Sequence, residues 1–272
     1  MVDQRPGPQS YSRAAHLRWL FGDLDGAIEL MALAVQAHVV SGSESTAWFQ
    51  TRLAMYLFQA GQFDPAEKIL TTTLARHSTY APALLVLGRI HLAQENHAQA
   101  VKIFTIAETI NPLPEYQWLL IEALLNNGQT ELAHAVEQRL KRTAITEDKR
   151  TYALYLASVA GDAALAQQLA KAELDVRQDV LTKDALAWSL FAAQQVPEAL
   201  MSIKQALSTG TRDARLFYHA AMITRAAGQN QQSLHWYQQA LLLQHMLYPS
   251  ERENLFSTFV KNQPHVTTVS TE

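Results

Sequence analysis

The stretch APALLVLGRIHLAQENHAQAVKIFTIAETINP, residues 81–112, decides the fold of this chain. The residues Leu84, Leu87, Gly88 and His91 stand at the i, i+3, i+4, i+7 spacing of one helix face. After a polar turn, a second stripe of the same kind runs over 100–110, and Pro112 ends it because proline cannot continue a helix. The stretch therefore predicts two helices joined by a short turn.

The same unit recurs along the chain. Each copy carries a turn signal and, five residues later, a small side chain. These small residues are Ala27, Ala66, Ala100, Ala133, Ala166, Ala199 and Ser233. They are 39, 34, 33, 33, 33 and 34 residues apart. Because small side chains let two helix backbones approach closely, the period predicts one tightly packed helix pair per unit.

The turns contain glycine in five of these units. Gly22, Gly61, Gly128, Gly161 and Gly228 stand where the first helix of the unit ends. This position favours a left-handed backbone conformation, which glycine adopts without steric cost. We therefore expect left-handed helix caps at these five residues.

These features resemble the tetratricopeptide repeat family, in particular its multi-repeat bacterial members. The third unit matches best, with Leu84, Leu87, Gly88, Ala100, Phe104, Ala107 and Pro112 in register and His91 in place of the usual Tyr. Units four and five depart from the pattern, since Glu137 and Ala170 stand where the family has Phe. The resemblance implies an all-α fold: a right-handed α-solenoid of about seven helix-turn-helix repeats with a short C-terminal capping helix.

Proline and polar residues divide the chain further. Pro249 breaks the last repeat, and Ser250 with Glu253 has the spacing of a capping box for a terminal helix. The five extra residues between units one and two are polar and small. The expected organisation is a flexible N-terminal segment (1–8), a repeat array (9–246) with a long loop near 39–46, a capping helix (249–260) and a disordered tail (261–272).

The N-terminal end lacks an equivalent cap, because the first residues are few and rich in proline. The segment that follows resembles an internal part of longer bacterial repeat proteins. We therefore expect that the chain is a piece of a larger protein, or that it dimerises through this end.

Composition excludes several kinds of function. The chain has 272 residues, 48% of them hydrophobic, and no Cys, which excludes disulfides and thiolate metal sites. Its net charge of −3 gives no indication of a nucleic-acid partner. Neither a secretory leader nor a membrane-spanning apolar run is recognisable, so we expect no membrane insertion. The sequence leaves the compartment open: cytoplasmic, or periplasmic or secreted if a signal was removed.

Catalytic motifs are also missing from the sequence. Phosphate-binding glycine loops, zinc-protease motifs and a serine nucleophile elbow do not occur. His91 and His97 are the nearest approach to a metal pair, but their spacing places them on different faces of a helix. We therefore expect no enzyme activity, no catalytic residue, no cofactor and no metal.

Family geometry assigns certain positions of each first helix to the inner, concave surface. Four of the five Trp residues fall on such positions, and aromatic residues, Met and Arg are typical of interface cores. An alternative is that part of this face is ordinary core. The predicted partner-binding groove comprises Trp19, Trp48, Met55, Phe58, Arg89, Trp118, Glu122, Tyr155, Trp188, Tyr218, Met222 and Arg225.

This groove predicts a non-enzymatic scaffold that binds a peptide or helical segment of a partner protein. The Lys and Asn residues with which some family members grip a C-terminal carboxylate are replaced here by side chains such as Thr51, Met55 and Leu85. Two alternatives remain: a self-assembling structural protein that forms homo-oligomers through its repeat ends, and the repeat portion of a longer enzyme or sensor.

Overall fold

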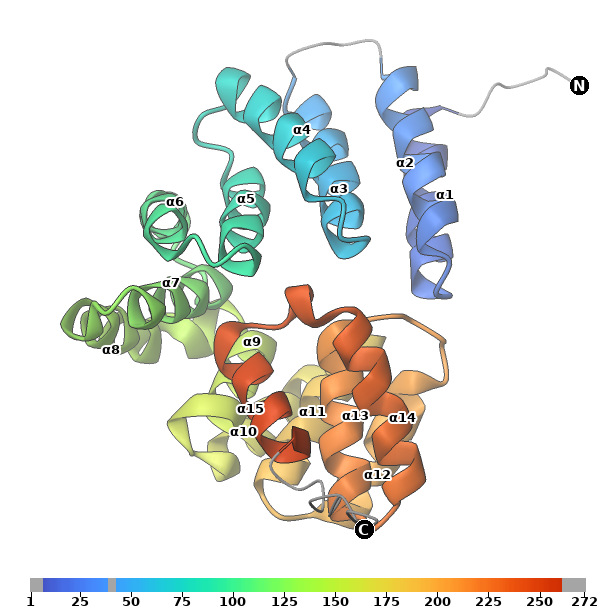
Figure 1. The fold of residues 1–272 in the computed structure, drawn as a ribbon, viewed down its shortest axis with the longest axis vertical. Coiled ribbons are helices and arrows are strands. Elements are labelled where there is room, and N and C mark those ends of the chain that lie inside the picture. Colours follow the sequence, from blue (N-terminus) through green and yellow to red (C-terminus); the bar gives the residue numbers. More distant parts are fainter. Residues whose placement is uncertain (1–6, 39–42, 261–272) are drawn as a thin grey trace, which may run out of the picture.

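The computed structural model describes residues 7–38 and 43–260. Within these ranges the chain forms helices and no strands, and the α-helices follow one another in pairs (Figure 1). The pairs are α1 (Pro8–Leu20) with α2 (Leu24–Ala37), α3 (Glu44–Gln59) with α4 (Phe63–Arg76), α5 (Ala81–Ala93) with α6 (His97–Ile110), α7 (Pro114–Asn126) with α8 (Thr130–Glu147), α9 (Lys149–Tyr155) with α10 (Ala163–Leu174), α11 (Val180–Ala192) with α12 (Val196–Leu207), and α13 (Ala214–Ala226) with α14 (Asn230–Leu242). The all-α array of repeated helix pairs is thus confirmed.

Three of the predicted segments fall wholly or partly outside the described residues. They are the N-terminal segment, described only from residue 7, the loop near 39–46, of which 39–42 are not described, and the tail 261–272. The end of the predicted loop needs a correction, because α3 already begins at Glu44 and residues 44–46 are helical. Ser43 caps it by accepting a hydrogen bond from the Thr46 N–H at 3.3 Å.

The small residues of the repeat lie where each pair closes. All seven, from Ala27 to Ser233, are at most 2% exposed. Gly88 shows how tight this packing is, because a Cβ atom placed on it would lie 2.4 Å from Cε1 of Phe104 in the same pair. The period in the sequence therefore reports the contact that holds each pair together.

The turns inside the pairs share one conformation. Gly22, Gly61, Gly128, Gly161 and Gly228 all have φ between 73° and 83°, which confirms the predicted left-handed caps. In the third and sixth pairs the same place is taken by Glu95 (φ 60°) and Gln194 (φ 61°). The turn geometry therefore persists even where glycine is absent.

The fifth pair differs from the others. Its first helix, α9, continues over Leu156–Ala160 as a π-helix, η1, which ends at the left-handed Gly161. This is one of the two units that depart from the family pattern in sequence. A π-helical turn accommodates an irregular register by widening the helix locally.

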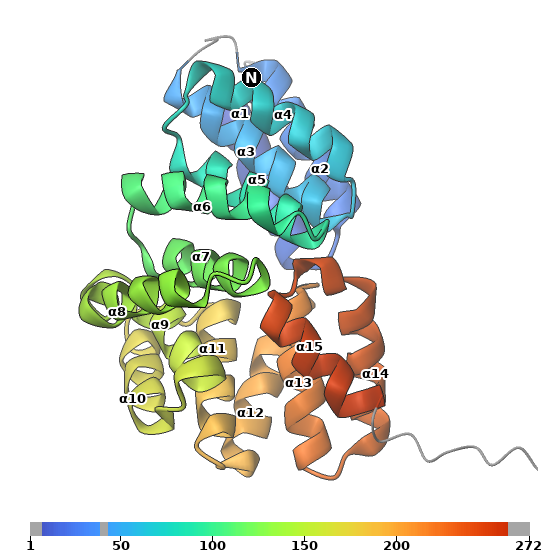
Figure 2. The same cartoon turned by 60° about the vertical axis from the view of Figure 1, so that its left-hand side comes forward.

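After α14 the chain does not continue the stack of pairs. Residues 243–260, here called the C-terminal strap, comprise a short 3₁₀-helix η2 (Gln244–Met246) and α15 (Pro249–Val260). The strap first reaches α3 and α5 and then returns as α15, which packs on α7 and α13 (Figures 1 and 2). It therefore crosses the inside of the array, from the α3 and α5 side to α7 and α13.

The two ends of the array also meet directly. Thr211 Oγ1 donates a hydrogen bond to the Leu20 carbonyl at 2.6 Å, and Gln59 Nε2 donates one to the Arg212 carbonyl at 2.6 Å. A Cβ atom on Gly22 would lie 2.5 Å from the carbonyl oxygen of Gly210. The array is therefore closed into a ring, in which the first two pairs touch the turn that precedes the seventh.

Candidate binding surface

The inside of the ring is formed by the first helix of every pair. A central hollow of about 350 Å³ is lined by residues of α1, α3, α5, α7, α9, α11 and α13, together with Met246 and Tyr248 of the strap. The predicted groove residues all lie on these seven helices. The inner surface assigned from the repeat register is therefore a real surface of the fold, but the strap runs across it.

The depth of the predicted groove residues varies widely. Trp48 is exposed, with 43% of its surface accessible; Trp19, Met55, Arg89, Met222 and Arg225 are half-buried; Phe58, Trp118, Glu122, Tyr155, Trp188 and Tyr218 are buried. The structure thus brings these side chains to the inner helices, but it does not place them on one continuous open face.

The strap covers the middle of the groove with an aromatic anchor. Tyr248 is 3% exposed, and its ring meets that of Trp118 edge-on at 4.8 Å. The Arg215 guanidinium lies 4.3 Å from the centre of the same tyrosine ring. Trp118 is fully buried beneath this contact. A side chain of the chain itself therefore occupies the position where a partner residue was expected.

Polar contacts fix the start of α15 in the same place. Ser250 donates two hydrogen bonds to the Glu122 carboxylate, from its backbone N–H at 3.1 Å and from its hydroxyl. Burial raises the pKa of Glu122, and the hydrogen bonds from Ser250 oppose that rise. Trp118 Nε1 also donates to Glu122, at 3.1 Å. Glu122 therefore serves the strap, so its carboxylate is not free for a partner.

The predicted capping box of this helix needs a correction. Glu251, not Glu253, returns to the helix start, where its Oε2 accepts a hydrogen bond from the Tyr248 N–H at 2.9 Å. Its Oε1 pairs with Arg215 Nε at 2.6 Å. The helix begins at Pro249, two residues earlier than a Ser250 cap would require, so the glutamate at the capping position also shifts by two residues.

The far end of the strap engages two more of the predicted residues. Asn254 Nδ2 donates a hydrogen bond to the Tyr218 hydroxyl at 2.9 Å. Phe259 stacks on Tyr237 at 4.3 Å, and the Arg225 guanidinium lies 5.1 Å from the Phe259 ring. Along its length, the strap therefore satisfies the groove residues of α7 and α13 much as a bound helical segment would.

The beginning of the strap, at His245 and Met246, contacts α3 and α5. His245 Nε2 lies 3.0 Å from the Phe58 carbonyl oxygen and 3.2 Å from that of Gln59, and donates to them. Arg89 Nη2 donates to the Met246 carbonyl at 3.0 Å. Burial lowers the pKa of His245, which favours its neutral form. Phe58 and Arg89 are therefore also strap contacts.

Three remaining aromatic residues have internal partners. Trp188 stacks on His219 at 4.1 Å and donates from Nε1 to Ser158 Oγ at 2.8 Å. The Tyr155 hydroxyl donates to Glu137 at 2.8 Å, and burial raises the pKa of this phenol. Trp19 Nε1 donates to Gln59 Oε1 at 2.7 Å. These side chains stabilise the ring from within, which matches the alternative that part of the inner face is core.

Trp48 is different, because it borders an open hollow. This hollow, here called the basic notch, has a volume of about 480 Å³ and lies between α1 and α3. Its lining includes Arg13, His16, Leu17, Trp48, Arg52 and Tyr56, with Met31 of α2 beneath. A second hollow of about 490 Å³, bordered by Phe49 and Tyr80, shares Ser12, Arg13 and Trp48 with it. The accessible part of the inner surface is thus on the first two pairs, α1 to α4, here called the N-terminal arm.

Sequence reasoning missed the two arginines of the notch, although the repeat contains a signal for them. Arg13 stands 14 residues before Ala27, and Arg52 stands 14 residues before Ala66. The same register position therefore carries arginine in two consecutive units, and packing of consecutive first helices brings the two side chains to one hollow.

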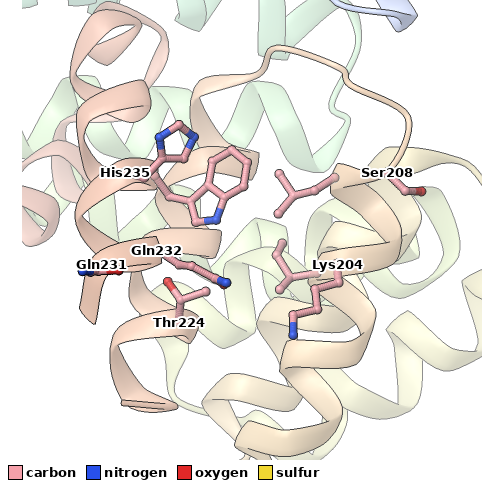
Figure 3. A pocket seen from close by; sticks show the side chains of 9 residues that line it. Lys204, Ser208, Thr224, Gln231, Gln232 and His235 are labelled. Atoms are coloured by element: carbon pink, nitrogen blue, oxygen red, sulfur yellow. The ribbon is translucent and has the colours of Figure 1, made fainter. Parts of the chain in front are cut away.

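Another hollow, of about 580 Å³, lies among α12, α13 and α14 (Figure 3). Lys204 and Ser208 border it on the α12 side, and Gln232 and His235 on the α14 side. It lies outside the predicted groove.

In the described part of the chain, no group of three His, Asp or Glu side chains could hold a metal ion, and no helix has the length and apolar character needed to cross a membrane.

Comparisons with known proteins agree with this architecture. A tetratricopeptide repeat family model matches residues 57–117. The fold is similar to Cut9–Hcn1 of the APC/C (TM-score 0.58, 14% identity, 89% of this chain and 48% of that chain) and to a monomeric IFIT1 mutant with Gppp-AAAA (TM-score 0.53, 13% identity, 97% and 76%). TTC0263, a tetratricopeptide repeat protein of Thermus thermophilus, aligns at 18% identity over 81% of this chain and 99% of its own, with a TM-score of 0.45. No curated protein sequence matches the chain.

The family model, the helix pairs and their 33–34-residue period together support a multi-repeat tetratricopeptide repeat protein. The structural likenesses, at these identities, describe the fold and not the ligand.

Proposed function

We propose that this protein is a scaffold that binds a partner protein on the inner surface of its N-terminal arm. The tetratricopeptide repeat fold suggests a protein-interaction scaffold, and proteins of this kind are generally not enzymes. The observation that carries the proposal is Trp48, a large aromatic side chain left 43% exposed over a hollow, while Trp118 and Trp188 are buried and Trp19 is half-buried. Tryptophan in such a position is typical of an interaction hot spot.

The strap restricts where a partner fits. Because it fills the inner surface at α7 and α13, the groove predicted from the sequence is reduced to Trp48 and its surroundings on α1 and α3. Met55 and Trp19 lie beside this region and line the central hollow. A partner segment docked in the notch would extend from the outer rim towards that hollow.

The test is capture of partners from an extract of the source cells by wild-type protein, by Trp48→Ala and by a control variant. Leu242→Ala is a suitable control, because Leu242 is 66% exposed and lies on α14, away from the notch. We expect Trp48→Ala to lose partners that wild type and Leu242→Ala retain, with all three proteins equally helical by circular dichroism. If Trp48→Ala keeps every partner, the proposal is wrong.

A second candidate function is self-assembly through the first pair. Leu33 on α2 is 41% exposed and Phe21 at the end of α1 is 67% exposed, so the first pair presents apolar side chains to solvent. Light scattering over a range of concentrations would test this candidate. If the protein self-assembles, the measured mass of wild type exceeds that of one chain, and Leu33→Glu lowers it to the mass of the monomer. A monomer mass at every concentration excludes self-assembly.

A further inference from the structure

The basic notch is lined by basic side chains that form no salt bridge within the described part of the chain; the nearest carboxylates, such as Glu44, border the adjoining hollows and not the notch itself. Arg13, His16 and Arg52 line it, and no Asp or Glu does. Among the described residues, neither Arg13 nor Arg52 forms an ion pair. Six other arginines are paired with carboxylates: Arg18, Arg139, Arg150, Arg177, Arg215 and Arg252. What distinguishes Arg13 and Arg52 from the remaining unpaired arginines is that they line the same hollow.

The overall composition makes this local surplus more notable. The chain has more Asp and Glu residues (25) than Lys and Arg residues (22), so carboxylates are not scarce. Burial and, to a lesser degree, the nearby Arg52 charge lower the pKa of His16, so this imidazole is neutral at neutral pH and the positive charge of the notch comes from Arg13 and Arg52. Like charges held together without a counter-charge favour an anionic ligand.

The floor of the notch is apolar and buried. Met31 and Tyr56 are each 1% exposed, and the half-open Trp48 ring and the exposed Leu17 stand on its walls. A volume of about 480 Å³ accommodates one or two bulky side chains. Apolar surface of this kind binds aliphatic or aromatic groups, which a small inorganic anion does not provide.

The Tyr56 side chain at this floor lies against Arg52. The Tyr56 hydroxyl is buried and forms no hydrogen bond of good geometry within the described part of the chain. Arg52 lies over the Tyr56 ring, with its guanidinium carbon 5.5 Å from the ring centre. Burial raises the pKa of Tyr56, and the charge of the adjacent Arg52 opposes that rise. The Tyr56 ring and the Arg52 guanidinium therefore form one side of the notch together.

These observations define the chemistry of the occupant. We propose that the basic notch docks a segment of a partner protein in which bulky apolar side chains are flanked by carboxylates. This proposal rests on the proposed scaffold function and names the kind of partner. The apolar side chains enter the notch against Met31, Tyr56 and Trp48, while the carboxylates pair with Arg13 and Arg52 at its rim.

The first part of the test uses fluorescein-labelled octapeptides and fluorescence anisotropy with the full chain. The probe DDLFDDLF carries both features. NNLFNNLF removes the charge at nearly the same shape, DDSSDDSS removes the apolar side chains, and KKLFKKLF reverses the charge. We expect binding of DDLFDDLF that weakens as salt rises, and at least tenfold weaker binding of the other three.

The second part uses variants of the protein. Arg13→Gln and Arg52→Gln are each expected to weaken DDLFDDLF binding about tenfold, since each removes a charge-assisted hydrogen bond. Arg142→Gln is the matched control, because Arg142 is exposed on α8, away from the notch, and is expected to bind like wild type. All three changes leave an unbranched polar side chain at partly or fully exposed positions, so the fold is retained.

Several results would overturn the proposal: equal binding of NNLFNNLF and DDLFDDLF, no effect of either arginine variant, or tighter binding of a uridine octanucleotide than of the acidic peptide. The last result would indicate a nucleic-acid ligand. Failure here is distinct from failure of the scaffold proposal. If partner capture depends on Trp48 but the acidic peptide does not bind, the surface is right and the partner chemistry is wrong.

Discussion

Two residues other than glycine adopt the left-handed backbone conformation that glycine adopts in the turns of the other pairs. Glu95 and Gln194 have φ near 60°, in the left-handed region, at the turns of the third and sixth pairs. For a residue with a Cβ atom this conformation costs about 1–2 kcal/mol, and glycine avoids the cost. The tight turn between paired helices evidently overrides local preference there.

We expect Gln194→Gly to raise the free energy of unfolding by about 0.5–1 kcal/mol, the relief of strain less the greater chain entropy of glycine. The measurement is the midpoint of urea unfolding at unchanged slope. Gly128→Ala is the converse control. A Cβ atom there would meet nothing within 4 Å, so backbone strain alone should lower stability. Equal midpoints for all three proteins would contradict this account.

Gly88 is constrained by packing and not by its backbone. Its missing Cβ leaves room for the Phe104 ring, which would otherwise lie at 2.4 Å. We expect Gly88→Ala to lower the free energy of unfolding by about 1–3 kcal/mol through overpacking. Combining it with Phe104→Leu should recover part of the loss relative to the sum of the two single changes, which a double-mutant cycle measures. Strict additivity would be evidence against this contact.

At the scale of elements, the strap is held by one central side chain. Tyr248 contacts Trp118 and Arg215 and is 3% exposed. We expect Tyr248→Ala to lower the free energy of unfolding by about 3–5 kcal/mol, the usual cost of removing a buried aromatic ring. Chemical denaturation measures the loss. Glu253→Ala on the same helix is the control, because Glu253 is exposed, and its stability should stay close to that of wild type.

The helix pairs could be predicted from the sequence, because their determinants are local and repeated. The buried small residues, from Ala27 to Ser233, recur with a nearly constant period and lie at the same contact in every pair. The left-handed glycines follow the same register. Such signals survive even in unit five, where the first helix becomes a π-helix.

The state of the inner face could not be predicted in this way. The register places Trp118 and Glu122 on the inside, but it does not tell whether another segment covers them. The covering contact joins Glu122 to Ser250, which are 128 residues apart in the chain. A contact that occurs once and at long range leaves no period in the sequence. Trp48 stays open because the strap does not reach it, and that too is a tertiary property.

At the scale of the whole molecule, one of the contacts that hold the ring together involves a titratable side chain, His245. His245 donates to the Phe58 and Gln59 carbonyls, and burial lowers its pKa below the ordinary value of 6.5. The unfolded chain therefore binds a proton at a higher pH than the folded chain does. The contribution of His245 to stability is complete above pH 6.5 and is lost as the pH falls below that value.

We accordingly expect wild type to lose stability as the pH falls from about 7 to about 5.5, and His245→Gln to lose less over the same interval. Glutamine can still donate a hydrogen bond to the carbonyls but does not titrate. His16 and His91 also have lowered pKa values, so the difference between the two proteins, and not the wild-type curve alone, isolates His245. Parallel curves of unfolding free energy against pH would contradict the assignment.

The closure between Leu20 and Thr211, 191 residues apart, also affects how this protein can change over evolution. An open array of repeats tolerates the gain or loss of a unit, because each unit contacts only its neighbours. In this ring, one unit more or fewer between the first and the seventh pair would separate Gly22 from Gly210 and displace the residues that the strap contacts. The number of repeats between these contacts is thus constrained by geometry, so that duplication or deletion of one of them would break the closure even though every individual helix pair remained intact.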